Sequence, residues 1–237
     1  MPTNIILTGG IFHPFGAASR ALSDILAGGG VSSVIFDDVA AGLRALHRSQ
    51  ADMLTVYALR WTMTQHEKYA PHRVQWAMSL SDEGRAAVTR HLARGGALLA
   101  LHTAVICFDD WAGWGDMLGA RWVWGRSSHP PFGRVDVRLT QTPGKLAAGL
   151  ETFGLDDEVY QGLEINADVA PLAEARALGA EAGWQTVAWT REHGGGRVAV
   201  DLLGHDGASL EQPEHRALLR RAALWALGRD AGEAVTR

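Results

Sequence analysis

Residues 95–103 read Gly95-Gly96-Ala97-Leu98-Leu99-Ala100-Leu101-His102-Thr103. A glycine pair ends a helix, and a short apolar run bounded by turn signals is typical of a buried strand. The polar pair His102-Thr103 follows this run directly. The stretch therefore predicts a buried strand over 97–101 that delivers His102 to its carboxyl end.

The same alternation of strand, glycine stop and helix runs through the first half of the chain. Segments with strand character alternate with segments of helical spacing, and this order predicts a mostly parallel central sheet with helices on both faces. The second half is less regular, with a hairpin turn at Gly194-Gly195-Gly196. Residues 60–78 break the pattern and are predicted to be an insertion over one end of the sheet. Strands are predicted over 4–8, 31–36, 51–58, 97–101, 121–124, 134–139, 187–190 and 197–203, and helices over 17–26, 39–47, 81–94 and 213–228.

Composition limits the function classes. The chain has 237 residues, which suits a single α/β domain over 1–237. A formal net charge of -4 and a pI of about 6.2 favour neither a nucleic-acid partner nor an anionic membrane. The sequence shows no signal peptide and no long apolar run, so the expected location is the cytoplasm. One cysteine, Cys107, excludes an internal disulfide and any zinc site with two cysteines.

Histidines carry the functional argument. His13, His102 and His205 each follow a predicted strand, and His129 lies in a loop after an aromatic segment. Ligands of open α/β sheets bind beyond the carboxyl ends of the strands, so these four side chains can converge. Each one alone is best explained as a structural residue, but the set favours acid–base chemistry or metal binding. The remaining histidines are interpreted as surface or structural residues: His47, His66, His72, His91, His193 and His215.

Acidic and aromatic residues add further candidates. Asp157 and Glu158 lie in an acidic run whose neighbours, among them Tyr160, are apolar or aromatic. A carboxylate that packs beside histidines is a general base, a metal ligand or an acceptor for sugar hydroxyls. Trp111 and Trp124 suit either stacking on sugar rings or packing in the core. Asp206 and Glu211 are weaker candidates of the acidic type.

Five motifs in order resemble one family. They are the strand and turn at 95–104, Leu118-Gly119 followed by His129-Pro130, Asp157-Glu158-Val159-Tyr160, the segment 187–198, and Leu203-Gly204-His205. Together they resemble the ThuA-like (trehalose utilisation) family across roughly residues 5 to 228. The resemblance implies a flavodoxin-like sheet related to the class I glutamine amidotransferases. It also implies a link to trehalose, related disaccharides and 3-keto-sugars.

One departure excludes amidotransferase chemistry. In the glutamine amidotransferases, the turn after this strand carries a nucleophilic cysteine, and a histidine near His205 activates it. Here the turn carries His102-Thr103, and Cys107 comes five residues later. A nucleophile has to stand on the turn itself to reach its base and the oxyanion donors. We therefore expect Cys107 to be dispensable.

The sequence leads to two functional hypotheses. The first is an enzyme that acts on a small carbohydrate, such as a disaccharide or keto-sugar, with histidine and carboxylate side chains moving protons. The second is a non-catalytic carbohydrate-binding or regulatory module on the same fold. A divalent metal such as zinc and assembly into a homo-oligomer are both compatible with the sequence. The expected catalytic residues are His102, His205, Asp157 and Glu158, the expected substrate-binding residues are His13, His129, Tyr160 and Trp124, and the metal candidates are His102, His129 and His205.

Overall fold

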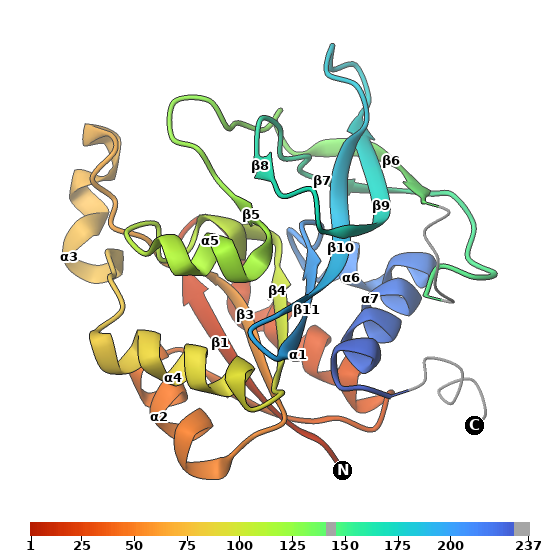
Figure 1. The fold of residues 1–237 in the computed structure, drawn as a ribbon. Coiled ribbons are helices and arrows are strands. Elements are labelled where there is room, and N and C mark those ends of the chain that lie inside the picture. The colour runs from red at the N-terminus through yellow and green to blue at the C-terminus, as the bar shows by residue number, and fades with distance from the viewer. Residues whose placement is uncertain (141–145, 230–237) are drawn as a thin grey trace.

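A nine-stranded sheet forms the centre of the computed structural model, which describes residues 1–140 and 146–229 (Figure 1). Its strands lie in the order β2-β1-β3-β4-β11-β10-β9-β6-β7. The first five of these are mutually parallel, which confirms the expected mostly parallel sheet. The strands are β1 (Thr3–Gly10), β2 (Ser32–Phe36), β3 (Met53–Leu59), β4 (Ala97–Leu101), β6 (Gly133–Leu139), β7 (Phe153–Asp157), β9 (Ala170–Ala177), β10 (Gln185–His193) and β11 (Gly196–Asp201).

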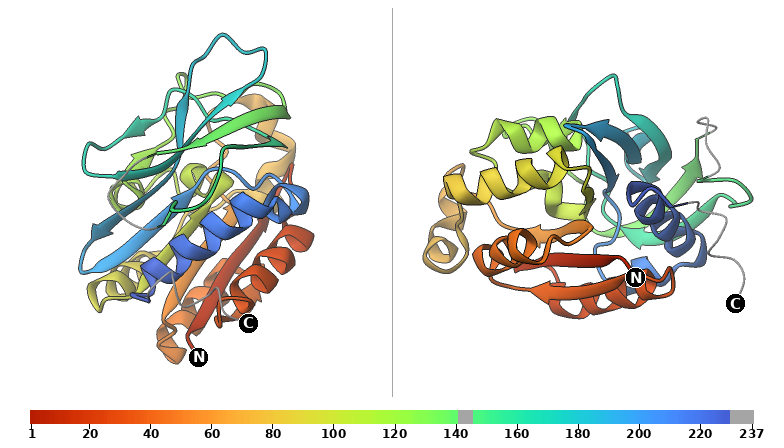
Figure 2. Two further views of the ribbon diagram at one scale, coloured as in Figure 1. Left: turned by 90° about the vertical axis from the view of Figure 1, so that its right-hand side faces the viewer. Right: turned by 60° about the horizontal axis from the view of Figure 1, so that its bottom comes forward.

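Helices cover both faces of the sheet, as expected (Figure 2). On one face α1 (Phe15–Ala27) contacts α6 (Gly207–Glu211) and α7 (Pro213–Ala226). On the other face α2 (Val39–Ser49) contacts α4 (Asp82–Ala93). Strands β3 and β4 lie between the two layers and are buried at every position, which explains their unbroken apolar sequence.

Helix starts follow from local sequence. The Asp38 side chain accepts a hydrogen bond from the Ala41 amide at 3.0 Å, and this caps α2. The Ser81 hydroxyl accepts one from the Gly84 amide at 3.2 Å, which confirms the start expected for α4.

An antiparallel extension completes the sheet beyond β11. The hairpin expected at 194–196 is confirmed, because β10 and β11 pair from His193 opposite Gly196. Strands β9, β6 and β7 then add in antiparallel order, so β7 again points the same way as β11 and β4. The carboxyl end of β7 therefore lies at the same edge as the carboxyl ends of the parallel strands.

The strand expected over 121–124 is wrong in extent. Only β5 (Ala120–Arg121) is extended, and it pairs with β8 (Glu164–Ile165) in a separate two-stranded sheet. The following tryptophans, Trp122 and Trp124, are half-buried and pack on other aromatic rings instead of entering a ladder.

Residues 60–78 leave the carboxyl end of β3 and return to α4. They contain a 3₁₀ helix, η1 (Glu67–His72), and one short turn, α3 (Arg73–Trp76). Two further short helices follow later strands: η2 (His102–Ile106) after β4, and α5 (Ala112–Leu118). Within the described ranges, none of the helices has the length and apolar character needed to cross a membrane.

Candidate active site

His102 stands on the sharp turn between β4 and η2. Its backbone has a φ of +49°, in the left-handed region that non-glycine residues adopt only at a cost of about 1–2 kcal/mol. The neighbouring Thr103 hydroxyl donates to the Ala58 carbonyl at 2.6 Å, which ties the turn to β3. The strained turn holds a buried imidazole at the carboxyl end of the central strand.

The hydrogen bonds of His102 fix which ring nitrogen faces the site. Its Nδ1 donates to the Leu202 carbonyl at 2.9 Å, so Nε2 keeps a lone pair. That Nε2 lies 3.1 Å from His13 Nε2 and 3.2 Å from the Tyr160 hydroxyl. Burial, reinforced by His13, lowers the pKa of His102 to about 3. The ring is therefore a neutral hydrogen-bond acceptor near neutral pH.

Glu158 lies among four imidazoles that come from four different loops. Its Oε2 atom is 3.6 Å from His102 Nε2 and 3.9 Å from His13 Nε2. Its Oε1 atom is 3.5 Å from His129 Nδ1 and 3.7 Å from His205 Nε2. Burial alone would raise the pKa of Glu158, but His13 and the neighbouring histidines outweigh it and lower the pKa. The carboxylate is thus ionised at the centre of the cluster.

Asp157 lies on the buried side of the cluster, with its Oδ1 4.0 Å from His102 Nδ1. Its side chain is fully buried and accepts hydrogen bonds from the Gly204 amide at 2.8 Å, the Glu158 amide at 2.7 Å and the Ser209 hydroxyl. Burial raises the pKa of Asp157 to about 6, against the effect of these donors. Asp157 joins the end of β7 to the chain after β11, and it does not face the opening of the site.

The opening is formed by His205 and His129. Their side chains are 18% and 39% exposed, against 7% for His13 and 0% for His102. Burial lowers the pKa of His205, and its Nδ1 is buried without a hydrogen-bond partner among the described residues. Phe132 packs on the same ring, with centroids 4.5 Å apart. A molecule entering the site meets these two rings first.

Tyr160 and the tryptophans line one side of the cluster. Tyr160 contacts the His102 ring at 5.1 Å between centroids, and Trp122 packs edge-on against Tyr160 at 5.4 Å. Trp124 lies further out, against Trp122 at 6.1 Å and stacked on Trp61 at 6.3 Å. The structure therefore brings Tyr160 to the histidines and separates Trp124 from them by two rings, those of Trp122 and Tyr160.

The donor set at the base of the site suits a divalent metal. One ligand atom each from His13, His102 and Glu158 lie within 4.8 Å of one another. His102 donates through Nδ1 to the Leu202 carbonyl, and His13 Nδ1 lies 3.3 Å from the Ile11 carbonyl, so a metal would find both Nε2 atoms oriented as in many metal-binding histidines. Two imidazoles with a carboxylate match zinc and similar ions. Of the metal candidates expected from sequence, His102 belongs to this group, whereas His129 and His205 face the other oxygen of Glu158.

Comparison with known proteins places the chain in a family. The family described as ThuA, trehalose utilisation, matches residues 44–226. The chain belongs to the ThuA family. No curated protein matches this ThuA-family chain.

Solved structures share the fold of this ThuA-family protein. A ThuA-like protein from Parabacteroides merdae ATCC 43184 aligns with a TM-score of 0.74 at 17% identity, covering 97% of this chain and 92% of that one. A ThuA-like protein from Bacteroides uniformis ATCC 8492 aligns at 0.66 and 14%, covering 97% and 94%. Cytoplasmic Protein STM1381 from Salmonella typhimurium LT2 aligns at 0.57 and 12%, covering 95% and 97%. At these identities the likeness concerns the fold.

Cys107 has the surroundings of a structural thiol in this ThuA-family member. Its Sγ donates to the Ala58 carbonyl at 3.1 Å and accepts from the Arg60 amide at 3.4 Å. Burial raises the pKa of the thiol to about 12, so it carries no thiolate near neutral pH. It lies beyond the turn, and His102 occupies the position on the turn itself.

A buried network missed by sequence reasoning lies beneath the site. His215 is completely buried, its Nε2 is 3.1 Å from Asp201 Oδ2, and its Nδ1 donates to the Ser209 carbonyl at 2.7 Å. His91 is buried as well, 2.8 Å from the Ala97 carbonyl, so both histidines are structural rather than surface residues. Asp206 caps α6 through the Ser209 amide at 3.0 Å. An acidic residue close before a helix start was the available signal for this last role.

Proposed function

We propose that this protein is an enzyme that acts on a small carbohydrate, such as a keto-sugar or an oxidised disaccharide. The reaction removes a proton from the carbon atom beside the carbonyl group. The observation that carries the proposal is the single ionised carboxylate, Glu158, within 3.5–3.9 Å of four imidazoles. Removing a proton from carbon beside a carbonyl needs a base and a group that stabilises the resulting enolate. The family description, trehalose utilisation, supports a carbohydrate as the substrate.

The residues divide the task by position. Glu158 is the base, because its carboxylate is ionised and its side chain is 11% exposed, within reach of a bound ligand. His205 and His129, at the opening, donate a hydrogen bond or a proton to the carbonyl oxygen. Tyr160 and His102 orient the substrate from the closed side. The His102 ring is neutral, and its Nε2 carries no proton. Asp157 acts as a positioning residue, since it holds the Glu158 amide and the turn before His205.

His13, His102 and Glu158 would hold a divalent metal such as zinc in this site. With an ion bound, Glu158 would serve as a ligand in place of the base. The ion would supply a Lewis acid for the substrate oxygen, and His205 or His129 would move the proton. Elemental analysis of the purified protein tests the assignment: we expect about one ion per chain, lost in His13→Ala and retained in His193→Ala. Equal metal content in all three proteins would contradict these ligands.

Deuterium exchange tests the proposed reaction directly. The protein is incubated in D₂O with a panel of 3-keto-glucosides and keto-monosaccharides, and NMR follows loss of the signal from hydrogen beside the carbonyl. We expect exchange with the parent and a loss of about 10²–10⁴-fold in Glu158→Gln. Asp156→Asn is the matched control, because this exposed carboxylate lies two residues earlier on the same segment. No exchange with any member of the panel, with binding retained, would favour the carbohydrate-binding or regulatory module instead.

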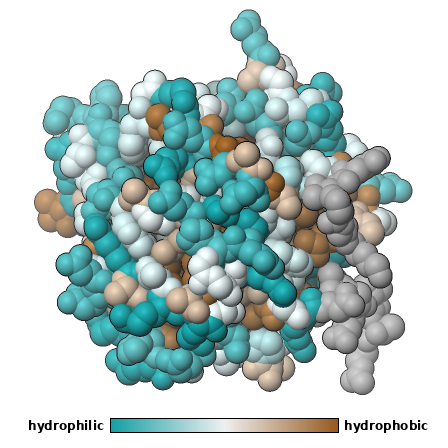
Figure 3. All heavy atoms as spheres, in the orientation of Figure 1, coloured by the Kyte–Doolittle hydropathy of each residue, from teal (hydrophilic) through white to brown (hydrophobic). Residues whose placement is uncertain are grey.

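The remaining expectations belong to the same proposal. We take the cytoplasm as the site of action and a small carbohydrate as the partner, and assembly into a homo-oligomer is tested by light scattering. Figure 3 shows apolar residues scattered among hydrophilic ones on the face drawn there.

A further inference from the structure

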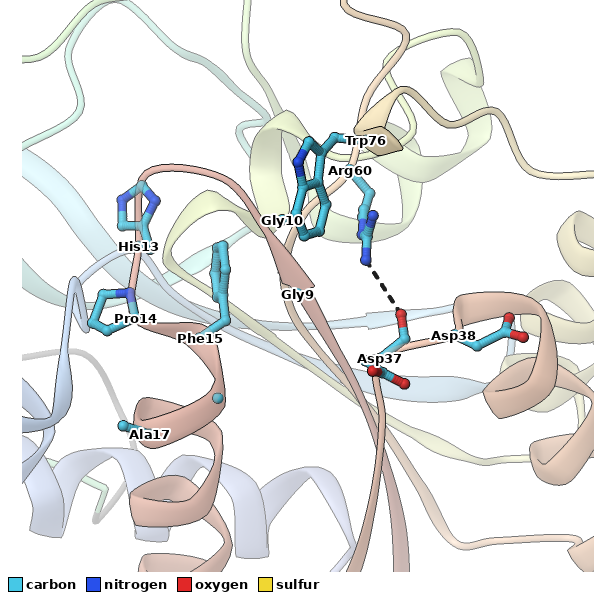
Figure 4. A pocket seen from close by; sticks show the side chains of 11 residues that line it. Gly9, Gly10, His13, Pro14, Phe15, Ala17, Asp37, Asp38, Arg60 and Trp76 are labelled. Atoms are coloured by element: carbon cyan, nitrogen blue, oxygen red, sulfur yellow. Dashed lines mark hydrogen bonds between the residues drawn. The ribbon is translucent and has the colours of Figure 1, made fainter. Parts of the chain in front are cut away.

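The histidines of the cluster are held in two different ways. His13 stands on the loop after β1, beside a cavity of about 550 Å³ (Figure 4). Arg60 and Trp76 also line this cavity, with the guanidinium 4.7 Å from the centre of the indole ring. The positions of His102 and His205 depend instead on residues 202–205, which follow β11 and are buried up to His205.

Residues 202–205 set the geometry of these two imidazoles. The Leu202 carbonyl accepts the hydrogen bond from His102 Nδ1 at 2.9 Å, which leaves the Nε2 lone pair for the site. His205 ends the segment, and its ring forms part of the opening. A shift of this segment would therefore displace both imidazoles at once.

Two buried carboxylates hold the segment from either side. Asp201 Oδ1 accepts a hydrogen bond from the Leu203 amide at 3.1 Å. Asp157 Oδ2 accepts one from the Gly204 amide at 2.8 Å and one from the His205 amide at 3.4 Å. The two acidic residues are only 3% and 1% exposed, so water does not compete for these hydrogen bonds.

His215 and Ser209 connect the two carboxylates. His215 lies in the first turn of α7 and is completely buried, and its Nε2 is 3.1 Å from Asp201 Oδ2. Its Nδ1 donates to the Ser209 carbonyl at 2.7 Å, and the Ser209 hydroxyl donates to Asp157 Oδ2. An imidazole that faces acceptors with both ring nitrogens donates to both only when it is protonated. The four residues thus form one continuous buried chain of charge-assisted hydrogen bonds between the ends of β11 and β7.

Stability alone does not account for this buried chain of polar residues. Moving ionised groups out of water costs free energy that apolar side chains of similar size do not incur, so a buried ion pair commonly adds little net stability. Buried polar networks whose members are all hydrogen-bonded do, however, make the structure around them rigid. The segment that this network makes rigid is the one that carries the Leu202 carbonyl and His205.

We infer that Ser209 and His215 are positioning residues, which hold residues 202–205 and thereby fix the Nδ1 hydrogen bond of His102 and the place of His205 in the site. The inference rests on the proposed function, since it assigns both residues to the same proton transfer. They act through the carboxylates of Asp157 and Asp201 and do not contact the substrate.

Solvent exchange of the His102 Nδ1 proton tests the positioning without any substrate. NMR of the ¹⁵N-labelled whole chain follows this buried imidazole proton directly. In Ser209→Ala we expect its exchange with water to become faster by about tenfold or more, because local opening of residues 202–205 becomes easier. Melting curves identify a Ser209→Ala protein that fails to fold, and His215→Gln then provides the second variant, with the same expected effect.

Two controls separate positioning from general loosening of the fold. The His91 Nε2 proton, donated to the Ala97 carbonyl at 2.8 Å, is a second buried imidazole proton at the other end of β4, and its exchange should not change. Ser19→Ala is the matched variant, because it also removes one buried hydroxyl, which lies 2.6 Å from Thr8 Oγ1. It should leave the His102 proton as in the parent.

The rate of deuterium exchange in a keto-sugar measures the consequence for the reaction. In Ser209→Ala we expect kcat to fall by about 10- to 100-fold while KM stays within about twofold of the parent, because displaced imidazoles slow the chemical step more than they weaken binding. Ser19→Ala should keep both constants.

Each outcome decides the inference. An unchanged His102 proton in both Ser209→Ala and His215→Gln overturns it, whatever the fate of the proposed function. Faster exchange of the His102 and His91 protons together also overturns it, since the whole fold is then loosened. A faster His102 proton with unchanged kcat removes the role in the reaction and leaves the proposed function intact. If the parent exchanges deuterium into no keto-sugar, the proposed function fails, and the His102 proton alone decides whether the network holds the segment.

Discussion

His102 combines a left-handed backbone with a completely buried ring. Its structural role in the turn can therefore be tested separately from the chemical role proposed for its imidazole. Asparagine adopts the left-handed region more readily than other non-glycine residues, and its amide can donate to the Leu202 carbonyl. Alanine has neither property. Substitutions at this residue can therefore be chosen to keep the turn while removing the imidazole.

We predict that His102→Asn and His102→Ala both slow proton transfer by about 10²-fold, because the imidazole proposed to orient the substrate is lost. Only the alanine variant should lose substantial stability, about 1–3 kcal/mol, because it leaves a buried carbonyl unpaired. His205→Ala should lose activity and keep its melting temperature, since that side chain is 18% exposed. Deuterium exchange and thermal unfolding measure the two effects separately. Full activity in His102→Asn would contradict a chemical role for the imidazole.

Cys107→Ser should keep the full rate of proton transfer. A serine hydroxyl can make the same two hydrogen bonds, to the Ala58 carbonyl and from the Arg60 amide. Because both hydrogen bonds are kept, we expect only a small loss of stability from burying the more polar hydroxyl. A variant that folds normally and has no activity would show that the sulfur takes part in the reaction.

At the scale of elements, His215 ties the start of α7 to the end of β11 through Asp201. Burial alone would lower the pKa of His215, but the charge and hydrogen bond of Asp201 outweigh it and raise the pKa to about 9. The folded-state pKa thus exceeds the value of 6.5 for a free imidazole. Protonated His215 stabilises the folded state fully below pH 6.5, and this stabilisation is lost as the pH rises through about 9.

We therefore predict that the free energy of unfolding falls between pH 6.5 and 9 with a slope of up to about 1.4 kcal/mol per pH unit from this one group. Denaturant unfolding at several pH values measures the slope in the parent and in His215→Gln. The variant should be less stable at pH 6 and should show a smaller slope. His193→Gln, at a half-buried site on β10, is the control. An identical pH dependence in parent and variant would exclude His215 as the titrating group.

Ligands of open α/β sheets bind beyond the carboxyl ends of the strands, and this rule explains how much of the site could be predicted from sequence. It found His13, His102 and His205 because each follows a strand whose apolar run is easy to recognise. Glu158 was found through its packed acidic run, although β7 itself was not predicted. Strand β9 was missed because its sequence, Ala-Pro-Leu-Ala-Glu-Ala-Arg-Ala, is rich in helix-favouring alanine, and pairing with β10 and β6 overrides that preference. The approach of Arg60 to Trp76 has no periodic signal, so only the structure reveals it.

At the scale of the whole molecule, residues from both halves of the chain meet in one site. His13 follows the first strand, and His205 follows the last one. We propose that residues 1–237 form one domain, and we predict a single cooperative unfolding transition. Far-ultraviolet circular dichroism and tryptophan fluorescence should report the same midpoint. Two separated transitions would indicate that the antiparallel extension folds independently.

The position of β11 also bears on how the chain emerges from the ribosome. β11 is synthesised last among the strands, yet it pairs between β4 and β10 in the middle of the sheet. Until about residue 201 has left the exit tunnel, the nascent chain exposes one unpaired edge of the apolar β4. Unpaired apolar edges promote aggregation. Translation of roughly a hundred residues therefore separates the synthesis of β4 from that of its final neighbour, so this edge stays open to pairing with other chains during that interval.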